Sequence, residues 1–236
     1  MRIVGVIPAR KGSKGIPNKN MIDLCGKHLI EHTFIESLKS NLDKVILTTD
    51  DDNIINLAQE KYPNIKVPFR RPDHLSCGDT EALDVVIHLL QWMKANNKEL
   101  PDALCWLQPT SPLRTIVNIN DCINLMRSSD VDSVISVVDV HGISPYKMKS
   151  INIDGFLEDL IKLENKSTNR QKLPKTYIPN GAIFMVKLDI LLKYKNFFGT
   201  KSVPYEMSEE SSVNIDTFLD AKIANLILEK RSQDEV

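Results

Sequence analysis

The sequence predicts an α/β fold with a mostly parallel, doubly wound sheet. Three observations carry this prediction. Short, almost continuously apolar segments alternate with segments that have an apolar stripe at helical spacing. Strands buried on both faces have that continuous apolar character, and helices must then cover both sides of the sheet. In addition, polar clusters directly follow several of the apolar segments, at the strand ends where open α/β sheets place their ligands.

The first half of the chain begins with an apolar run at residues 3–7, which is the first predicted strand. The second strand is predicted at 45–49, and the aspartates at 50–52 suit the first turn of a helix that reaches Tyr62. We predict a short third strand at 65–69. Asp79 and Thr80 are predicted to cap a long helix. One face of that helix is expected to carry Leu83, Val86, Ile87 and Leu90.

In the second half, a buried strand is predicted at 103–107, a helix at 116–128 and a strand at 133–140. The segment 141–176 is polar and has no clear period, and such a long irregular stretch is usually functional or disordered. A strand at 177–187 and a helix at 188–194 follow. The last helix has a predicted buried stripe, with a frayed tail from 231 to 236. The stripe consists of Leu219, Ile223, Leu226 and Ile227.

The composition excludes several classes of protein. The chain has 236 residues, 42% of them hydrophobic, and a net charge of −1, so no overall attraction to nucleic acid is expected. The four cysteines form no C-x-x-C pair and suit a reducing compartment. We find neither a secretory leader nor an apolar stretch of the ~20 residues that span a bilayer. The expectation is a soluble cytoplasmic protein without nucleic-acid or membrane partners.

The most informative segment is the basic loop, residues 10–20, which follows the first strand and is rich in Arg, Lys, Gly, Ser and Asn. Glycines let backbone N–H groups face an anion, and the cations supply charge, so the loop is predicted to bind a polyphosphate. It is not a Walker A loop, since Ile16 follows Gly15, and it lacks the G-x-G-x-x-G spacing. The alternative interpretation is a solvated basic turn.

Two further clusters are predicted at the same sheet edge. Residues 108–114, Gln-Pro-Thr-Ser-Pro-Leu-Arg, offer hydrogen bonds suited to a polyhydroxylated ligand, or else form a capped strand-to-helix turn. Asp216 and Asn214 precede the last helix, and an oxygen ligand beside a polyphosphate suggests Mg²⁺. The alternative for Asp216 is a plain helix cap.

Three isolated cations complete the candidates. Arg71 follows the third predicted strand and is suited to contact base, ribose or phosphate; the alternative is a surface arginine. Arg170 is a suitable clamp for a ligand carboxylate, because its guanidinium is planar and bidentate. Taken alone, Arg170 and Lys147 are ordinary solvated cations. We find no Ser/His/Asp set and no nucleophilic cysteine.

The motifs IPARKGSKGIPNKN, LQPTSPLR, RQKLP…PNGAIF and NIDTFLD resemble those of the CMP-sialic acid synthetases, or acylneuraminate cytidylyltransferases, in register over residues 3–228. A looser relation to the CMP-Kdo synthetases follows from the shared fold. The resemblance implies a single nucleotidyltransferase domain over 1–236, Rossmann-like or GT-A-like. It also implies that 141–176 is an inserted arm that packs across a homodimer and helps complete the partner's sugar site.

The resemblance also implies roles for individual residues. The triphosphate of CTP would be held by Arg10, Gly12, Ser13, Lys14, Lys19 and Asn20, with Arg71 near the cytidine. The acidic sugar would be met by Gln108, Thr110, Ser111, Lys147, Arg170, Asn180, Gly181, Phe197 and Phe198. The catalytic set would be Arg10, Lys14, Lys19 and Asp216, and Mg²⁺ would be bound by Asp216. Relatives often have Asp where this chain has Asn214, which keeps an oxygen ligand but loses a charge.

The reaction implied is attack by the anomeric hydroxyl of a nine-carbon 2-keto acid sugar, an N-acylneuraminate, on the α-phosphate of CTP, with release of pyrophosphate. Alternatives are a legionaminic, pseudaminic or Kdo-like acid as acceptor, GTP as donor, or a non-catalytic nucleotide-binding homologue. No general base is evident; a metal-bound water and Asp216 itself are the candidates.

Overall fold

The centre of the molecule is a mixed sheet whose strands follow the order β10-β6-β9-β5-β1-β4. The computed structural model describes residues 1–13, 15–128, 130–140, 145–161 and 174–234. The strands of this sheet are β1 Ile3–Ala9, β4 Lys44–Thr49, β5 Ala103–Trp106, β6 Ser133–Asp139, β9 Tyr177–Lys187 and β10 Ser202–Glu206. Of these six strands, β9 alone runs antiparallel to its neighbours, β5 and β6. The prediction of a mostly parallel sheet is therefore confirmed.

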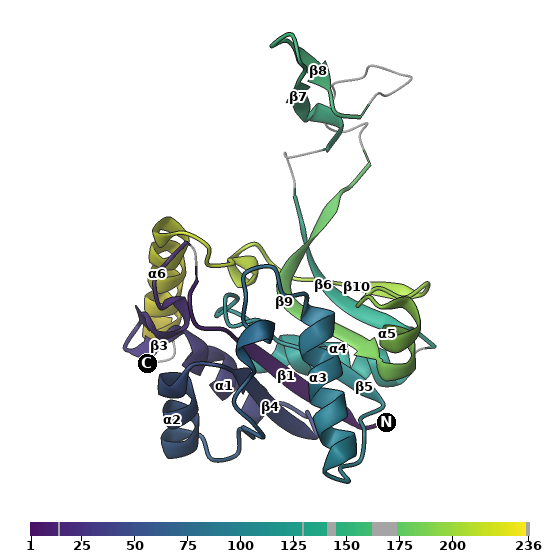
Figure 1. Ribbon diagram of the computed structural model, residues 1–236. Helices are drawn as coiled ribbons and strands as arrows, with labels where there is room; N and C mark the ends of the chain where they lie inside the picture. The colour runs from purple at the N-terminus through teal and green to yellow at the C-terminus, as the bar shows by residue number, and fades with distance from the viewer. Residues whose placement is uncertain (14, 129, 141–144, 162–173, 235–236) are drawn as a thin grey trace.

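Helices cover both faces of the sheet (Figure 1). The first face packs against α1 Leu29–Lys39, α2 Asp52–Lys61 and α4 Ile116–Ser128, and the second against α3 Ala82–Ala95 and α5 Leu188–Tyr194. Strand β1 shows why, because its side chains alternate between two buried clusters. Ile3 and Ile7 belong to the cluster on the first face, and Val4 and Val6 to the cluster on the second. The doubly wound arrangement is thus built into the first strand.

Several sequence predictions of single elements need correction. Residues 65–69 do not form a strand; they run beside β4 through isolated bridges, one of them between Ile46 and Lys66. Pro68 offers no N–H to continue the ladder. Helix α3 begins after Glu81, not at Asp79 or Thr80. Its buried face is Val85, Val86, Leu89, Leu90 and Met93.

Two of the larger elements, a helix and a strand of the central sheet, were not predicted. Helix α1 is amphipathic and buries Leu29, Ile30 and Phe34. Strand β10 contains Pro204, which is tolerated because β10 pairs with β6 on one side only, at the edge of the sheet. Small paired strands, β2 Asp23–Leu24 and β3 Lys27–His28, and the 3-10 turns η1 Lys19–Met21, η2 Asp73–Leu75 and η5 Glu210–Ser212 complete the body.

The last helix, α6 Phe218–Asp234, exists as predicted, but it presents a different face to the core. Leu219 and Leu226 are each 66% exposed and Ile223 is also exposed, whereas Ala224 is buried beside Ile16 and Ile215. The predicted buried stripe is therefore wrong except for Ile227, which is partly buried. The helix also continues to Asp234, beyond the predicted start of fraying at residue 231. No helix in the described part of the chain is long and apolar enough to cross a membrane.

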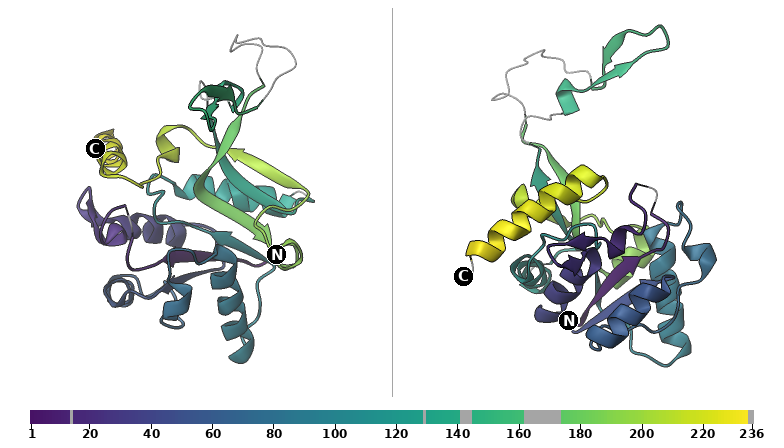
Figure 2. Two further views of the ribbon diagram at one scale, coloured as in Figure 1. Left: turned by 45° about the horizontal axis from the view of Figure 1, so that its top comes forward. Right: turned by 90° about the vertical axis from the view of Figure 1, so that its left-hand side faces the viewer.

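An arm projects from the body where β6 and the amino-terminal end of β9 extend beyond the sheet (Figures 1 and 2). The described part of this arm is residues 145–161: the turn η3 Pro145–Lys147 and an antiparallel hairpin of β7 Lys149–Ile151 and β8 Leu157–Asp159. Several of its large apolar side chains are exposed, among them Ile151 at 72% and Phe156 at 69%. Of the rest of the predicted segment, 141–144 and 162–173 lie outside the described residues, and 174–176 lead into β9.

Candidate active site

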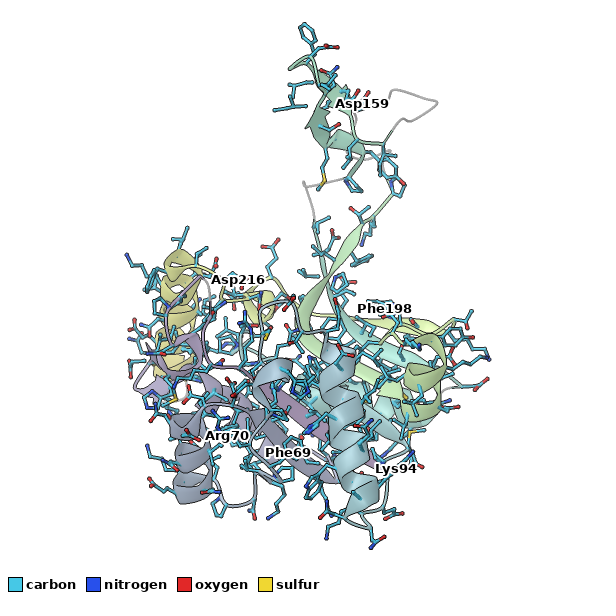
Figure 3. The ribbon with its side chains drawn as sticks, in the orientation of Figure 1. Phe69, Arg70, Lys94, Asp159, Phe198 and Asp216 are labelled. Carbon is cyan, nitrogen blue, oxygen red and sulfur yellow. The ribbon has the colours of Figure 1, made fainter. Side chains whose placement is uncertain are left out.

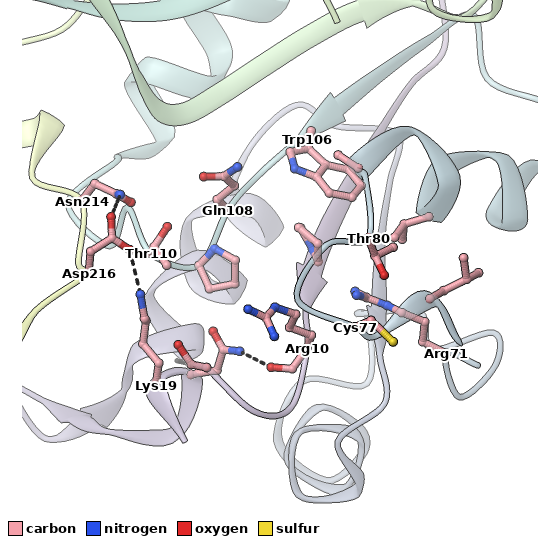
Figure 4. Close-up of a pocket in the computed structure, with 17 residues that line it drawn as sticks. Arg10, Lys19, Arg71, Cys77, Thr80, Trp106, Gln108, Thr110, Asn214 and Asp216 are labelled. Carbon is pink, nitrogen blue, oxygen red and sulfur yellow. Dashed lines mark hydrogen bonds and ion pairs between the residues drawn. The ribbon is translucent and has the colours of Figure 1, made fainter. Parts of the chain in front are cut away.

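A cavity of about 450 Å³ opens at the carboxyl edge of β1 and β5 (Figure 4). Segments far apart in the sequence meet here, as expected for strand-end loops of a parallel sheet. The predicted residues that line it are Arg10, Ser13, Lys19, Asn20, Arg71, Gln108, Thr110, Asn214 and Asp216. The three clusters identified in the sequence thus share one pocket.

The basic loop closes partly on itself before it reaches the pocket. Gly12 has φ of 77°, in the left-handed region that favours glycine, and its carbonyl accepts a 2.9 Å hydrogen bond from Nη1 of Arg10. The Asn20 amide nitrogen donates to the Arg10 carbonyl at 3.2 Å. Arg10 is therefore held across the loop with its guanidinium at the pocket wall, while Lys14 lies outside the described residues.

Lys19 joins this loop to the segment before α6. Its ammonium donates to the Asp216 carboxylate and to the Ile215 carbonyl, both at 2.8 Å. The Lys19 residue is only 8% exposed, although it is a lysine. Gly15 lies against the same segment, because a Cβ at this glycine would stand 2.5 Å from the Asp216 carbonyl oxygen. Two contacts therefore fix the basic loop against the predicted metal ligand.

Asn214 presents an unusual oxygen to this region. Its Nδ2 donates to Asp216 Oδ2 at 3.0 Å, but its Oδ1 is buried without a hydrogen-bond partner. A buried acceptor without a partner costs roughly 1–3 kcal/mol, so a ligand that supplies a donor or a cation would stabilise it. Among the described residues, no three His, Cys, Asp or Glu side chains gather as a metal site. The Asn214 amide oxygen and the Asp216 carboxylate are nevertheless oxygen donors of the kind that Mg²⁺ takes together with phosphates.

Arg71 is a buried residue of the pocket floor, so the interpretation as a surface arginine is wrong. It is 3% exposed, and its guanidinium donates to the hydroxyl (3.1 Å) and the carbonyl of Thr48. Burial lowers the pKa of Arg71 to about 10, while the nearby Asp50 carboxylate acts in the opposite direction. The residue remains charged at neutral pH, at the end of the pocket away from Asp216 (Figure 4).

The loop after β5 and the start of β9 form another wall. Gly181 has φ of 79°, and a Cβ there would come within 2.9 Å of Gln108 Oε1. Glycine at this position therefore allows the Gln108 side chain to keep its observed position. The side chain of Asn180 is already hydrogen-bonded behind this wall. Its Oδ1 accepts from Ser136 Oγ at 2.6 Å, and its Nδ2 donates to Ser212 Oγ at 2.8 Å. The side chain of Ser111 is likewise fully buried.

Aromatic residues extend this wall. Trp106 lines the pocket, and its ring centroid lies 5.7 Å from that of Phe197. Phe184 connects both phenylalanines of the predicted pair, at 6.0 Å from Phe197 and 6.3 Å from Phe198. Phe198 is 42% exposed, on the side of the body from which the arm rises (Figure 3). The predicted pair therefore lies behind the pocket wall: Phe197 contacts Trp106 directly, and Phe198 is joined to it through Phe184.

Not every predicted residue lies at the pocket. Lys147 is exposed on the arm, and Arg170 lies outside the described residues. Arg114, the last residue of the second motif, is fully buried behind the wall. In contrast, Cys77, Thr80 and Trp106 line the pocket and were missed. The loop with Cys77 and Thr80 follows a segment that runs beside β4. That position, after a segment at the sheet edge, could have predicted that the loop lines the pocket.

Comparisons with known proteins agree with this geometry. A family model described as cytidylyltransferase matches residues 4–211. The N-acylneuraminate cytidylyltransferase of Streptococcus agalactiae is 33% identical over 220 residues, which cover 92% of this chain and 51% of that protein. The chain thus spans about half the length of that relative. The CMP-N,N'-diacetyllegionaminic acid synthase of Legionella pneumophila is 29% identical over 97% of both chains.

A solved structure shows the same fold. It is that of a CMP:2-keto-3-deoxy-manno-octonic acid synthetase complexed with CTP, and it superposes with a TM-score of 0.70 at 16% identity. The superposition covers 98% of this chain and 100% of that one. With the family model spanning most of the sheet and the whole of the pocket's basic loop, the chain belongs to the cytidylyltransferase family.

Proposed function

We propose that this chain transfers CMP from CTP to the anomeric hydroxyl of a nine-carbon 2-keto acid sugar, an N-acylneuraminate, and releases pyrophosphate. The observation that carries the proposal is the single pocket in which a cationic loop faces the Gln108 wall, with the Asn214 and Asp216 oxygens at its end. The membership of the family and the names of the relatives support it.

The protein's part in this reaction is alignment and charge neutralisation, since phosphoryl-type transfer needs little covalent help. Arg10, Lys14 and Lys19 would neutralise the triphosphate and the departing pyrophosphate, with hydrogen bonds from Gly12, Ser13 and Asn20. Arg71, charged and held by Thr48 at the other end of the pocket, would contact the nucleoside end of CTP. The nucleotide would then lie along the pocket.

We propose that Asp216 and the unpartnered Asn214 Oδ1 hold Mg²⁺. When bound, the ion would neutralise charge on the phosphate oxygens. Lys19 is the cation that contacts Asp216 in the structure, so it compensates the same carboxylate from the loop side. Among the described pocket residues, the exposed carboxylate of Asp216 is our candidate to accept the proton of the attacking hydroxyl.

The acidic sugar would occupy the wall of Gln108 and Thr110, with Gly181 leaving room for Gln108 and Phe197 and Phe198 bounding the side. Lys147 lies on the projecting arm, so it would reach a sugar from the arm of a second copy, and we propose the same role for Arg170. We therefore propose a homodimer, with residues 1–236 as one domain and 141–176 as its inserted arm. The exposed apolar side chains of the arm support this assignment. The four free thiols suit the cytoplasm.

A second acceptor has specific support. The Legionella relative of matching length is named for a legionaminic acid product, so a legionaminic acid is the principal alternative acceptor. Pseudaminic or Kdo-like acids, GTP as donor and a non-catalytic nucleotide-binding role are further alternatives.

The test is pyrophosphate release by the purified chain with Mg²⁺, CTP or GTP, and each of the four acids in turn. We expect turnover that requires CTP, Mg²⁺ and a nine-carbon acid together, with N-acetylneuraminate the best. Faster turnover with a legionaminic acid would move the assignment to that acceptor. CTP binding by calorimetry without turnover on any acid would overturn the enzymatic proposal.

A further inference from the structure

A second cavity, of about 440 Å³, lies on the other side of the loop after β5, between α1, the start of α4 and the end of α6. It shares no lining residue with the first pocket. None of the residues predicted to contact the nucleotide or the sugar lines this cavity. Its walls are instead notable for their charge.

Cations dominate the lining of this cavity. The basic and acidic side chains on it are Lys27, His32, Lys39, Arg114, Arg231 and Glu36. Burial lowers the pKa of His32, so its ring is neutral at pH 7. The Glu36 carboxylate is already engaged, since it accepts from the Ile116 N–H at 2.6 Å and lies 3.6 Å from the Lys39 ammonium. Among the described residues, Arg231 and Lys27 have no ion pair with a carboxylate on the wall, and Arg114 feels the Glu36 carboxylate only as a nearby charge, without a hydrogen bond to it.

The two arginines are held only by neutral groups among the described residues. Arg231 donates to the Leu113 carbonyl at 3.0 Å and to Ser211 Oγ at 3.2 Å. Arg114, 2% exposed, donates to the Thr33 hydroxyl at 2.7 Å and to the Ala182 carbonyl at 2.5 Å, and its Nε has no partner. A buried guanidinium without a hydrogen-bonded anion is costly, and an anion in the adjacent cavity would offset more of that cost than the Glu36 charge does.

Arg114 also touches the wall of the first pocket from behind. Its Nη1 contacts the Gln108 carbonyl at 3.3 Å as well as the Ala182 carbonyl. Gln108 lines the first pocket, and Ala182 follows Gly181, against which the Gln108 side chain lies. One almost fully buried side chain on the wall of the second cavity therefore also contacts the backbone behind the first pocket.

We propose that the second cavity binds a small organic anion with at least two negative charges, a phosphate ester or a polycarboxylate, and that its occupation alters sugar binding in the first pocket through Arg114. The anion would be held by Arg231 and Lys27 at the wall and by the field of the buried Arg114. The second part of this inference rests on the proposed function; the first part does not.

The test of the site is calorimetric titration of the full chain with glucose 6-phosphate and, separately, with citrate, without Mg²⁺ or nucleotide. We expect one of them to bind with Kd below about 1 mM. Arg231→Gln should weaken that binding at least about tenfold, because a charge-assisted contact is lost. Lys230→Gln, which removes an exposed charge from the neighbouring position of α6, should leave the Kd unchanged. Lys27→Gln, an exposed residue, provides a second variant if Arg231→Gln unfolds.

The site would be rejected if neither anion binds, or if Arg231→Gln and Lys230→Gln weaken binding equally. Loss of all binding in Arg10→Gln would also reject it, because the anion would then lie in the first pocket. The coupling is tested separately, by the KM for the acidic sugar with and without the bound anion. A change in the unsubstituted chain that disappears in Arg231→Gln supports the coupling, and an unchanged KM rejects it. Failure of turnover itself would leave the binding result standing.

Discussion

The Lys19 ammonium lies 2.8 Å from the Asp216 carboxylate and ties the amino-terminal basic loop to the segment before the last helix. The pair is asymmetric, because the side chain of Lys19 is 9% exposed and that of Asp216 is 69% exposed. A phosphate would compete with Asp216 for the lysine, and a cation would compete with Lys19 for the carboxylate. This contact is therefore the place where nucleotide and metal binding would meet.

Lys19→Ala tests that role. We expect the rate of pyrophosphate release to fall on the order of 10²–10³-fold at saturating CTP, by comparison with the loss of a single transition-state donor. Lys11→Ala is the matched control: Lys11 is exposed in the same loop and contacts Asp50 through its backbone N–H only, at 2.8 Å. A loss below about threefold for Lys19→Ala, or equal losses in both variants, would argue against this role.

Asn214→Asp tests the metal proposal. The substitution adds a carboxylate two residues from Asp216 and replaces the unpartnered oxygen by a charged ligand. We expect Mg²⁺ or Mn²⁺ to bind roughly tenfold more tightly, because affinity for hard cations rises with ligand charge. Electron paramagnetic resonance of Mn²⁺ measures this without turnover. Asn214→Ala should weaken binding, and an unchanged affinity in both variants would remove Asn214 from the site.

Gly181→Ala tests the wall behind Gln108. The methyl group would meet Gln108 Oε1 at 2.9 Å, and φ of 79° disfavours any side chain. Gly155→Ala in the arm is the matched control, since its φ is 84° but nothing lies within 4 Å. Both variants should lose about 1–2 kcal/mol of stability from the backbone strain alone. Only Gly181→Ala should also raise the KM for the acidic sugar, and equal kinetics would show that Gln108 does not contact it.

The sequence was sufficient to predict those features that depend on local chemistry. The continuous apolar strands and the polar clusters after them predicted the sheet and nine of the pocket's lining residues, because carboxyl ends of parallel strands must share an edge. It was insufficient where tertiary contacts decide. Nothing local marks Arg71 as buried against Thr48, or Asn180 as occupied by Ser136 and Ser212.

The last helix shows the same limit. Its apolar stripe predicted a buried face, yet Leu219 and Leu226 are largely exposed and the small Ala224 is buried. Close approach of α6 to Ile16 and Ile215 favours a small residue at the contact, which hydrophobicity alone does not reveal. Strand β10 was missed for a related reason, because an edge strand tolerates Pro204.

Glu31→Gln tests how α1 is held. Burial by itself raises the pKa of Glu31, but hydrogen bonds from the His28 N–H (2.7 Å) and the Tyr62 hydroxyl (2.8 Å), together with the nearby Lys61 charge, outweigh it and hold the pKa below its ordinary value. The ionised carboxylate therefore adds stability at neutral pH. That contribution is lost as the pH falls below about 4.5, the ordinary pKa of the unfolded chain, and then through the lowered pKa of the folded state.

We expect Glu31→Gln to reduce the free energy of unfolding by about 1.5–3 kcal/mol at pH 7, the range for hydrogen bonds to a charged group. The difference from the unsubstituted chain should shrink as the pH is lowered toward 3. Chemical denaturation at several pH values measures it. Glu60→Gln, at an exposed position of α2, should show little change at any pH. If the difference in the free energy of unfolding did not change with pH, the charge of Glu31 would not be the source of the stabilisation.

The arm provides the test of the proposed homodimer. Ile151 and Phe156 are 72% and 69% exposed, and apolar side chains of this kind are expected to be covered by another surface. Replacing both by Asp should convert a dimer into a monomer in size-exclusion chromatography with light scattering. Leu192→Asp, at a 46% exposed position of α5, should leave the mass unchanged. A monomeric unsubstituted chain would reject the homodimer directly.

If arms cross between subunits, two inactive chains should complement each other. A Lys14→Ala chain lacks a loop cation, and an Arg170→Ala chain lacks the arm's arginine. In a crossed dimer, one mixed site receives an intact loop from one chain and an intact arm from the other. Mixing under conditions of subunit exchange should then restore up to about a quarter of the activity, because half of the dimers are mixed and each has one intact site of two. If mass measurement demonstrates subunit exchange but no activity returns, Arg170 serves its own subunit.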